Sequence, residues 1–209
     1  MNQNMRGDIL ERSQKLFFSK GYRKVTIDGI AASLSISKKT IYKYFRSKKD
    51  LLDHSFDLYR ENITRDINTV LETPGLPFPE KLKRVLSSIG IHMGGMNTVL
   101  FRDIQELAPD LWEKIKSYKH EAAYLRFNKL IEEGRNNGHI KKDINRAVII
   151  ALYASAIENL LDPAFINNLP IELSEEIPAL PIEVFENAIK IIYEGILTPE
   201  TIKSLGDSP

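Results

Sequence analysis

Hydrophobic residues recur at the three- and four-residue intervals of amphipathic helices along most of the chain. In residues 7–20, for example, the apolar side chains share one stripe, and Gly21 follows where a C-terminal cap is expected. No run of alternating β-branched residues bounded by turn signals interrupts this pattern. The sequence therefore predicts an all-α fold. The expected helices cover approximately residues 7–20, 27–34, 38–45, 47–71, 80–92, 97–107, 110–136, 145–161 and 182–197.

Two short helices joined by a tight turn are predicted between residues 26 and 45. Thr26 is expected to cap the first helix, whose apolar residues have the i, i+3, i+4, i+7 spacing of a buried stripe. The segment 35–37 then interrupts the helix. The second helix follows, with Ile41 and Phe45 on its inner face. Two short helices in this arrangement are typical of a helix-turn-helix unit.

A proline-rich segment separates this region from the rest of the chain. Ser47 is expected to cap a long helix that ends near residue 71, and the next stretch, 73–79 (TPGLPFP), cannot be helical because of its prolines and glycine. We therefore expect an N-terminal three-helix helix-turn-helix domain over residues 6–66 and a larger C-terminal helical bundle over residues 67–209. The proline-rich and acidic segment 162–181 is expected to be a loop.

Charge is distributed unevenly along the 209 residues, although the net charge is only +1. Residues 1–53 contain 12 Lys or Arg and 5 Asp or Glu, a net charge of +7, so residues 54–209 carry a net charge of −6. Such asymmetry indicates a nucleic acid or another anionic surface as partner. A basic face that is merely solvated is the alternative.

The second short helix offers cations on the side opposite its apolar face. Lys39 and Lys43 lie four residues apart and fall roughly opposite Ile41 and Phe45. The major groove of DNA admits one α-helix, whose N-terminal residues reach base edges while flanking cations and hydroxyls bind phosphates. The helix pair, more than the charge, therefore predicts binding to double-stranded DNA.

This part of the chain resembles the N-terminal domain of TetR-family transcriptional regulators. Three sub-motifs carry the resemblance in order: residues 26–31 (TIDGIA), 34–45 (LSISKKTIYKYF) and 47–52 (SKKDLL). The resemblance implies a homodimeric repressor whose C-terminal helices bind a small inducer and dimerise. The residues that match the family's DNA-contact positions are Thr26, Ser37, Lys38, Lys39, Thr40, Tyr42, Lys43, Tyr44 and Lys48. For the tyrosines, core packing is the alternative.

Two positions depart from the common pattern of the family. Ser35 occupies a turn position often held by glycine, which leaves the conformation of the turn open. Lys39 replaces the small residue frequent early in the recognition helix, which implies an individual operator preference.

The last two long helices carry more apolar surface than one helix contact needs, and small residues on the first of them allow close approach. We expect the two helices to pair with their symmetry mates in a four-helix dimer interface. The alternative is that both are wholly buried within one subunit. The residues predicted for the interface are Ala147, Ile150, Ala151, Ala154, Ile182, Phe185, Ile189, Ile192 and Ile196.

The middle helices carry an aromatic and methionine set suited to a mostly apolar small-molecule effector. The candidate ligand-binding residues are His92, Met93, Met96, Phe101, Trp112, Tyr118, Tyr124, Phe127 and Tyr153. For each of them, simple core packing is the alternative.

Other classes of protein find little support. The chain has no cysteine, which excludes disulfides and thiolate sites, and it lacks the common hydrolase, zinc-protease and phosphate-loop motifs. Asp103 and Glu106 are paired acids of the kind that usually form a solvated face. We therefore expect no enzymatic activity, no cofactor and no metal site. The longest apolar run, 147–157, is too short to span a bilayer, and a cytoplasmic protein is expected.

The sequence thus predicts a DNA-binding transcriptional regulator, namely a repressor released from a palindromic operator by a small ligand. Two alternatives remain: an activator or ligand-independent DNA binder of the same fold, and a helical ligand-binding protein without a DNA function.

Overall fold

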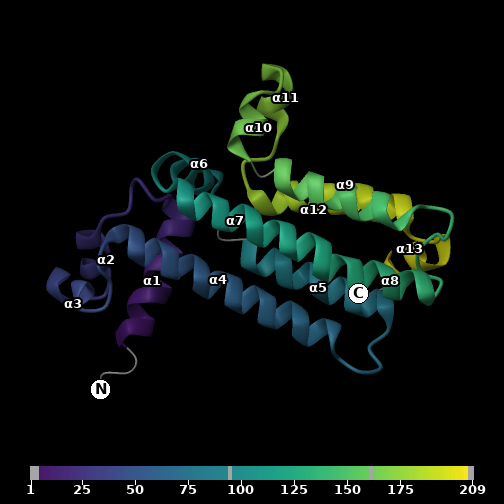
Figure 1. The fold of residues 1–209 in the computed structure, drawn as a ribbon, viewed down its shortest axis with the longest axis horizontal. Coiled ribbons are helices and arrows are strands. Elements are labelled where there is room, and N and C mark those ends of the chain that lie inside the picture. The colour runs from purple at the N-terminus through teal and green to yellow at the C-terminus, as the bar shows by residue number, and fades with distance from the viewer. Residues whose placement is uncertain (1–4, 94–95, 161, 207–209) are drawn as a thin grey trace.

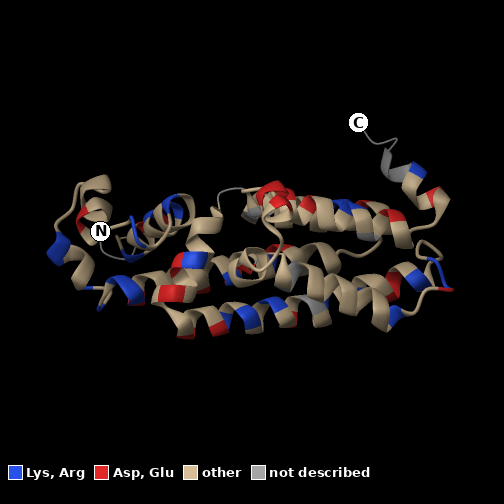
Figure 2. Cartoon of the chain, turned by 90° about the horizontal axis from the view of Figure 1, so that it is seen from above, with Lys and Arg blue, Asp and Glu red and all other residues tan. Residues whose placement is uncertain are grey.

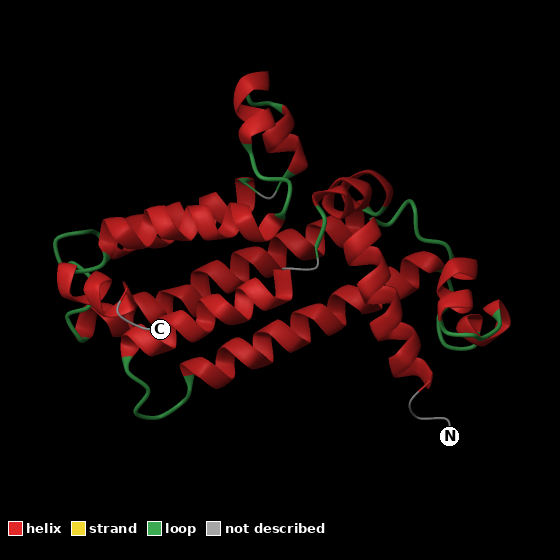
Figure 3. Ribbon diagram, turned by 180° about the vertical axis from the view of Figure 1, so that it is seen from behind, coloured by secondary structure: helices red, strands yellow, loops and turns green. Residues whose placement is uncertain are grey.

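The computed structural model describes residues 5–93, 96–160 and 162–206, and this part of the chain consists of helices joined by short loops (Figures 1 and 3). The all-α prediction is confirmed. Within the described residues, β-type pairing is confined to an isolated antiparallel bridge between Ile140 and Leu197. The helices are α1 Met5–Lys20, α2 Ile27–Ser33, α3 Lys38–Tyr42, α4 Lys48–Leu71, α5 Phe78–Met93, α6 Thr98–Leu107, α7 Pro109–Glu121, the π-helix η1 Ala122–Phe127, α8 Asn128–Asn136, α9 Arg146–Asn159, α10 Pro163–Asn167, α11 Ile171–Glu176, α12 Pro181–Ile196 and α13 Pro199–Gly206.

Helices α1, α2 and α3 lie at one end of the molecule, around the first turns of α4 (Figure 1). The predicted hydroxyl caps form: Thr26 Oγ1 accepts a hydrogen bond from the Gly29 amide at 3.0 Å, and Ser47 Oγ accepts one from the Asp50 amide at 3.0 Å. Each satisfies one of the amides that a helix start leaves without an intrahelical acceptor. The polar residues that begin these helices therefore set where the chain turns.

Helix α4 runs from this end into the rest of the molecule, where it packs against α5 (Figure 1). Helices α7, η1 and α8 follow one another without a break and run alongside α4 and α5, and α9 and α12 form a further layer (Figure 1). A single long helix was predicted for the α7–η1–α8 stretch. The structure differs by the six-residue π-helical segment Ala122–Phe127, which lies on the side facing α4.

The expectation of a loop over residues 162–181 was wrong. Two short helices, α10 and α11, occupy most of it and project from the bundle (Figure 1). Pro163 stands at the first position of α10, where proline is favoured because its missing N–H is not needed, and Asp162 accepts a hydrogen bond from the Ala164 amide at 2.8 Å. Proline acts here as a helix start. Helix α13 was not predicted either, and α3 ends three residues earlier than expected.

Buried side chains from the N-terminal helices and from α6 and α7 share one core. Phe17, Ile41 and Leu52 belong to the same cluster as Leu100 and Trp112. A second cluster lies among α5, α8, α9 and α12. The helix-turn-helix end is therefore packed directly onto part of the C-terminal half. Among the described residues, no helix is both long and apolar enough to cross a membrane.

Candidate nucleic-acid interface and effector cavity

Helices α2 and α3 form the predicted helix-turn-helix pair, and residues 34–37 form the turn between them. Ser35 adopts a φ of +56°, and among the described residues it is the one non-glycine residue with a positive φ. This left-handed conformation favours glycine because a Cβ is crowded there. Ser35 therefore takes a conformation that glycine would adopt more readily.

Helix α3 buries one side and exposes the other. Ile41 and Phe45 are buried, whereas Lys39 and Lys43 are exposed and Tyr42 is 46% exposed. Ser37 Oγ accepts a hydrogen bond from the Thr40 amide at 3.1 Å, which begins α3 and leaves its N-terminal turn at the surface. Figure 2 shows basic residues at this end of the molecule. Thr26, Ser37, Lys38, Lys39 and Lys43 all lie exposed on the α2–α3 unit.

Two of the predicted contact lysines have partners in the free protein. The Lys38 Nζ lies 3.1 Å from Asp28 Oδ2, and this hydrogen bond and charge raise the pKa of Lys38. The Lys48 Nζ lies 4.2 Å from the centre of the Tyr22 ring, and partial burial lowers the pKa of Lys48. Tyr44 and Thr40 are partly buried. Lys39 and Lys43 are therefore the more open cations of α3.

A buried carboxylate joins the N-terminal helices to α6. Asp103 is 4% exposed and accepts a hydrogen bond from the backbone N–H of Arg23 at 2.7 Å, and the Arg23 guanidinium also reaches Glu106 at 2.6 Å. Gly21, with a φ of +85°, is needed for this approach, because a Cβ there would stand 2.8 Å from Asp103 Oδ2. The interpretation of Asp103 as part of a solvated face was wrong: α1 and α6 cross at this point and cover it.

A second polar contact connects α4 to α7. Lys49 Nζ lies 2.6 Å from Asp110 Oδ2 and 3.4 Å from Asp53 Oδ2. In sequence, Lys48-Lys49 resembles any pair of surface lysines, so only the packing of α7 against the start of α4 reveals this contact. Together with Arg23 and Asp103, it ties the helix-turn-helix end to α6 and α7.

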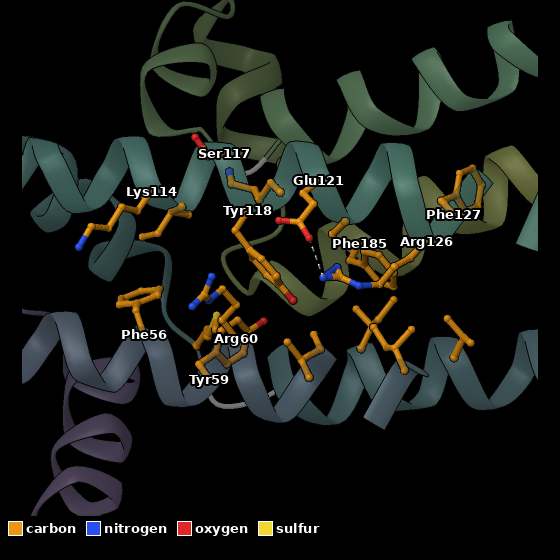
Figure 4. A pocket seen from close by; sticks show the side chains of 18 of the residues that line it. Phe56, Tyr59, Arg60, Lys114, Ser117, Tyr118, Glu121, Arg126, Phe127 and Phe185 are labelled. Carbon is orange, nitrogen blue, oxygen red and sulfur yellow. Dashed lines mark ion pairs between the residues drawn. The ribbon is translucent and has the colours of Figure 1, made fainter. Parts of the chain in front are cut away.

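A cavity of about 620 Å³ lies among α4, α5, α7 and η1 and reaches α9 and α12 (Figure 4). Apolar side chains such as Ile63, Val85 and Leu130 form much of its wall, and Arg126, Glu121 and Tyr118 bring polar groups to it. The volume falls within the range of about 300–1,000 Å³ found for small-molecule sites.

Five of the nine candidate ligand-binding residues predicted from the sequence line the cavity: Met96, Phe101, Tyr118, Phe127 and Tyr153. His92 instead binds Asp66 at 2.8 Å, Trp112 is buried in the N-terminal core, and Tyr124 is 40% exposed beside His120. The side chain of Met93 lies outside the described part of the structure. Arg126 was not predicted as a ligand-binding residue, because nothing in the local sequence distinguishes a charged residue that lines a cavity from one on the surface.

The predicted interface residues divide between the inside and the outside of the subunit. Ala147 and Ala151 are exposed and Ile182 is partly exposed, whereas Ile150, Ala154, Phe185, Ile189 and Ile196 are buried against neighbouring helices. The Ile192 side chain lies outside the described part. Val148, Leu152 and Ile191, which were not selected, are 51%, 61% and 74% exposed. Helices α9 and α12 thus expose apolar residues on their outer faces, and the sequence-based prediction of the dimer interface did not include these residues.

The fold and the exposed α3 define a helix-turn-helix DNA-binding protein, and comparisons with known proteins agree. Residues 9–54 match the model of bacterial regulatory proteins of the tetR family. An uncharacterized HTH-type transcriptional regulator of Bacillus subtilis, YvaF, is 25% identical over 92% of this chain and 95% of its own. Residues 9–54 are therefore a helix-turn-helix region of the TetR type, and the chain as a whole is similar to an HTH-type transcriptional regulator.

Two further matches differ in how much of the chain they cover. IcaR of Staphylococcus aureus, the HTH-type negative transcriptional regulator of the biofilm operon icaADBC, is 39% identical over 51 residues, which cover 24% of this chain and 27% of its own. A TetR-family regulator from Agrobacterium tumefaciens has a TM-score of 0.68 and 15% identity over 94% of this chain and 99% of its own. The fold is thus shared over nearly the whole chain.

Proposed function

We propose that this regulator is a homodimeric repressor that a small, mostly apolar ligand releases from its operator. Residues 6–66 serve as the DNA-binding domain and residues 67–209 as the ligand-binding and dimerisation domain. One observation carries the proposal: Phe56 of α4 belongs to the core of the helix-turn-helix end and also lines the cavity. A ligand that displaces this part of α4 therefore acts directly on the helix that supports the DNA-reading unit.

In the proposed complex, α3 enters the major groove and Lys39 and Lys43 meet base edges or phosphates, because they are its exposed cations. Thr26, Ser37, Lys38, Thr40, Tyr42, Tyr44 and Lys48 supply the remaining contacts. Lys38 exchanges Asp28 for a phosphate, since both partners of that ion pair lie at the surface. The match to the negative regulator IcaR over 51 residues supports repression as the outcome.

Dimerisation is proposed through the outer faces of α9 and α12. Val148 and Leu152 stand one turn apart on α9, beside the exposed Ala147 and Ala151, and Ile191 adds a large apolar side chain from α12. A helix with apolar residues on both its inner and outer faces usually has a partner on each side. Two copies of α3 would then read half-sites about 34–36 Å apart, or a multiple of that distance.

Release of the repressor from its operator depends on the contacts between the helix-turn-helix end and helices α6 and α7. The ligand must bind the form with the wrong half-site spacing more tightly, because only a difference in affinity between two states shifts their populations. Movement of α4 or α7 at the cavity is transmitted through the Lys49–Asp110 ion pair and the Arg23–Asp103 hydrogen bond.

Fluorescence anisotropy of the protein with the DNA upstream of its own gene, and with a scrambled duplex, tests the DNA function. Selective binding that persists at about 0.15 M salt is expected, because nonspecific phosphate contacts weaken steeply as salt rises. Equal binding to both duplexes would contradict sequence-specific regulation. Transcription in vitro from the selected DNA should fall when the protein is added, and a rise would identify an activator.

A further inference from the structure

Arg126 is a buried cation on an otherwise largely apolar stretch of the cavity wall. Its side chain is 13% exposed, and it lies on η1 beside Phe127 (Figure 4). Its Nη2 donates to Thr64 Oγ1 at 3.3 Å, and its guanidinium carbon lies 5.3 Å from the centre of the Tyr118 ring. Among the described residues, Nη1 is buried and has no hydrogen-bond partner.

An unpaired buried donor on a charged group is costly, so its presence needs an explanation. The nearest carboxylate, Glu121 Oε1, lies 3.8 Å from Nη2, and its side chain is 55% exposed. That contact is a long and solvated ion pair, and it leaves Nη1 unbound. The guanidinium is thus held in place through Nη2, whereas Nη1 lacks an acceptor.

The backbone around Arg126 is also unusual. Residues Ala122–Phe127 form a π-helix, which is rare and is often found at functional sites. The segment brings Ala122, Arg126 and Phe127 to the same cavity. Tyr118 of α7 also lines the cavity, and Thr64 Oγ1 of α4 lies 3.2 Å from Tyr118 Oη and accepts the hydrogen bond from Arg126, so Thr64 links the two polar residues of the wall.

We propose that the effector is an apolar carboxylic acid whose carboxylate is bound by Arg126, with the Tyr118 hydroxyl as a neighbouring polar group. The proposal rests on the proposed function of the cavity as the effector site. A guanidinium suits a carboxylate because its N–H groups match the two oxygens. Because the Glu121 carboxylate lies 3.8 Å from Arg126, one negative charge on the ligand is favoured over two. Ile63, Ile67, Val85, Ile89 and Leu130 surround the space for the apolar part.

Calorimetric titration with four ten-carbon probes tests the proposal: decanoate, decanol, decyl phosphate and decylammonium, each below its micelle concentration. Decanoate should bind the full-length protein about tenfold or more tightly than decanol, since a hydrogen bond to a charged group contributes at least that factor. Arg126→Met should abolish this preference and leave decanol binding unchanged. Unchanged decanol binding also shows that the variant retains its cavity.

Arg60→Met is the matched control, because Arg60 also lines the cavity but is 51% exposed and pairs with Asp57 at 3.7 Å. This variant should keep the preference for decanoate. Equal binding of decanoate and decanol, or tighter binding of decylammonium or decyl phosphate, would overturn the carboxylate assignment and leave the cavity as an effector site. If none of the four probes binds, the effector role of the cavity fails as well.

Discussion

Replacement of Asp103 by alanine should destabilise the protein through a backbone group rather than through a salt bridge. The Asp103 side chain is 6% exposed and accepts the Arg23 backbone N–H at 2.7 Å, while its distance to the Arg23 guanidinium is 3.9 Å. A hydrogen bond to a charged acceptor contributes about 1.5–3 kcal/mol. Asp103→Ala should therefore lower the free energy of unfolding by about 2 kcal/mol.

The Arg23 side chain should matter much less. It is 61% exposed, and its partner Glu106 is 52% exposed, so this ion pair is solvated. Exposed pairs typically contribute under about 1 kcal/mol. Arg23→Ala keeps the backbone N–H that Asp103 binds, and Asp103→Asn keeps an oxygen that can accept it. Both variants should lie between the native protein and Asp103→Ala in stability.

Thermal unfolding at a fixed protein concentration separates these cases. For a chain of this size, 2 kcal/mol corresponds to a fall in Tm of about 4–8 °C. Glu106→Ala serves as the control for loss of the exposed ion pair and should have a small effect. If Arg23→Ala lowers Tm as much as Asp103→Ala does, the side-chain pair and not the backbone contact holds α1 to α6, and the reasoning is refuted.

Three further predictions concern the turn, the DNA contact and the dimer. Ser35→Val should lower the free energy of unfolding, measured by urea titration, by about 1–2 kcal/mol, because a β-branched residue is strained at a φ of +56°. Ser35→Gly should be tolerated, and equal effects of the two substitutions would contradict this account. Lys39→Ala should relax operator preference at one base pair by about 1–3 kcal/mol, measured by anisotropy with single-base variants; a uniform loss would assign Lys39 to phosphate instead. Ile191→Glu should yield monomers in analytical ultracentrifugation, unlike Ile171→Glu on the projecting α11; a persistent dimer would place the interface elsewhere.

Much of the N-terminal unit could be predicted because its determinants are local. A hydroxyl residue caps the helix that follows it, as at Thr26 and Ser47, and apolar spacing within a few turns defines a buried face. The same short-range rules located most of the long helices. They failed at residues 162–181, where Pro163 starts a helix, because proline stops a helix at most positions but is favoured at the first.

The position of a side chain relative to distant helices could not be predicted from the sequence. On α9 and α12 nearly every face carries apolar residues, so periodicity alone did not show that Ile189 would be covered within the subunit and Ile191 left outside. The same limit applies to charged residues, because Asp103 and Arg126 have no local feature that distinguishes them from solvated residues.

The sequence by itself determined the all-α fold and the helix-turn-helix unit, because hydrogen bonds and apolar contacts between neighbouring turns specify them. Tertiary structure decided the features of regulatory interest. The burial of Asp103 depends on α6 crossing α1 near Gly21, and the setting of Arg126 depends on α4, α7 and η1 enclosing one cavity. Burial depends on which segments cover a side chain, and those segments lie far away in the sequence.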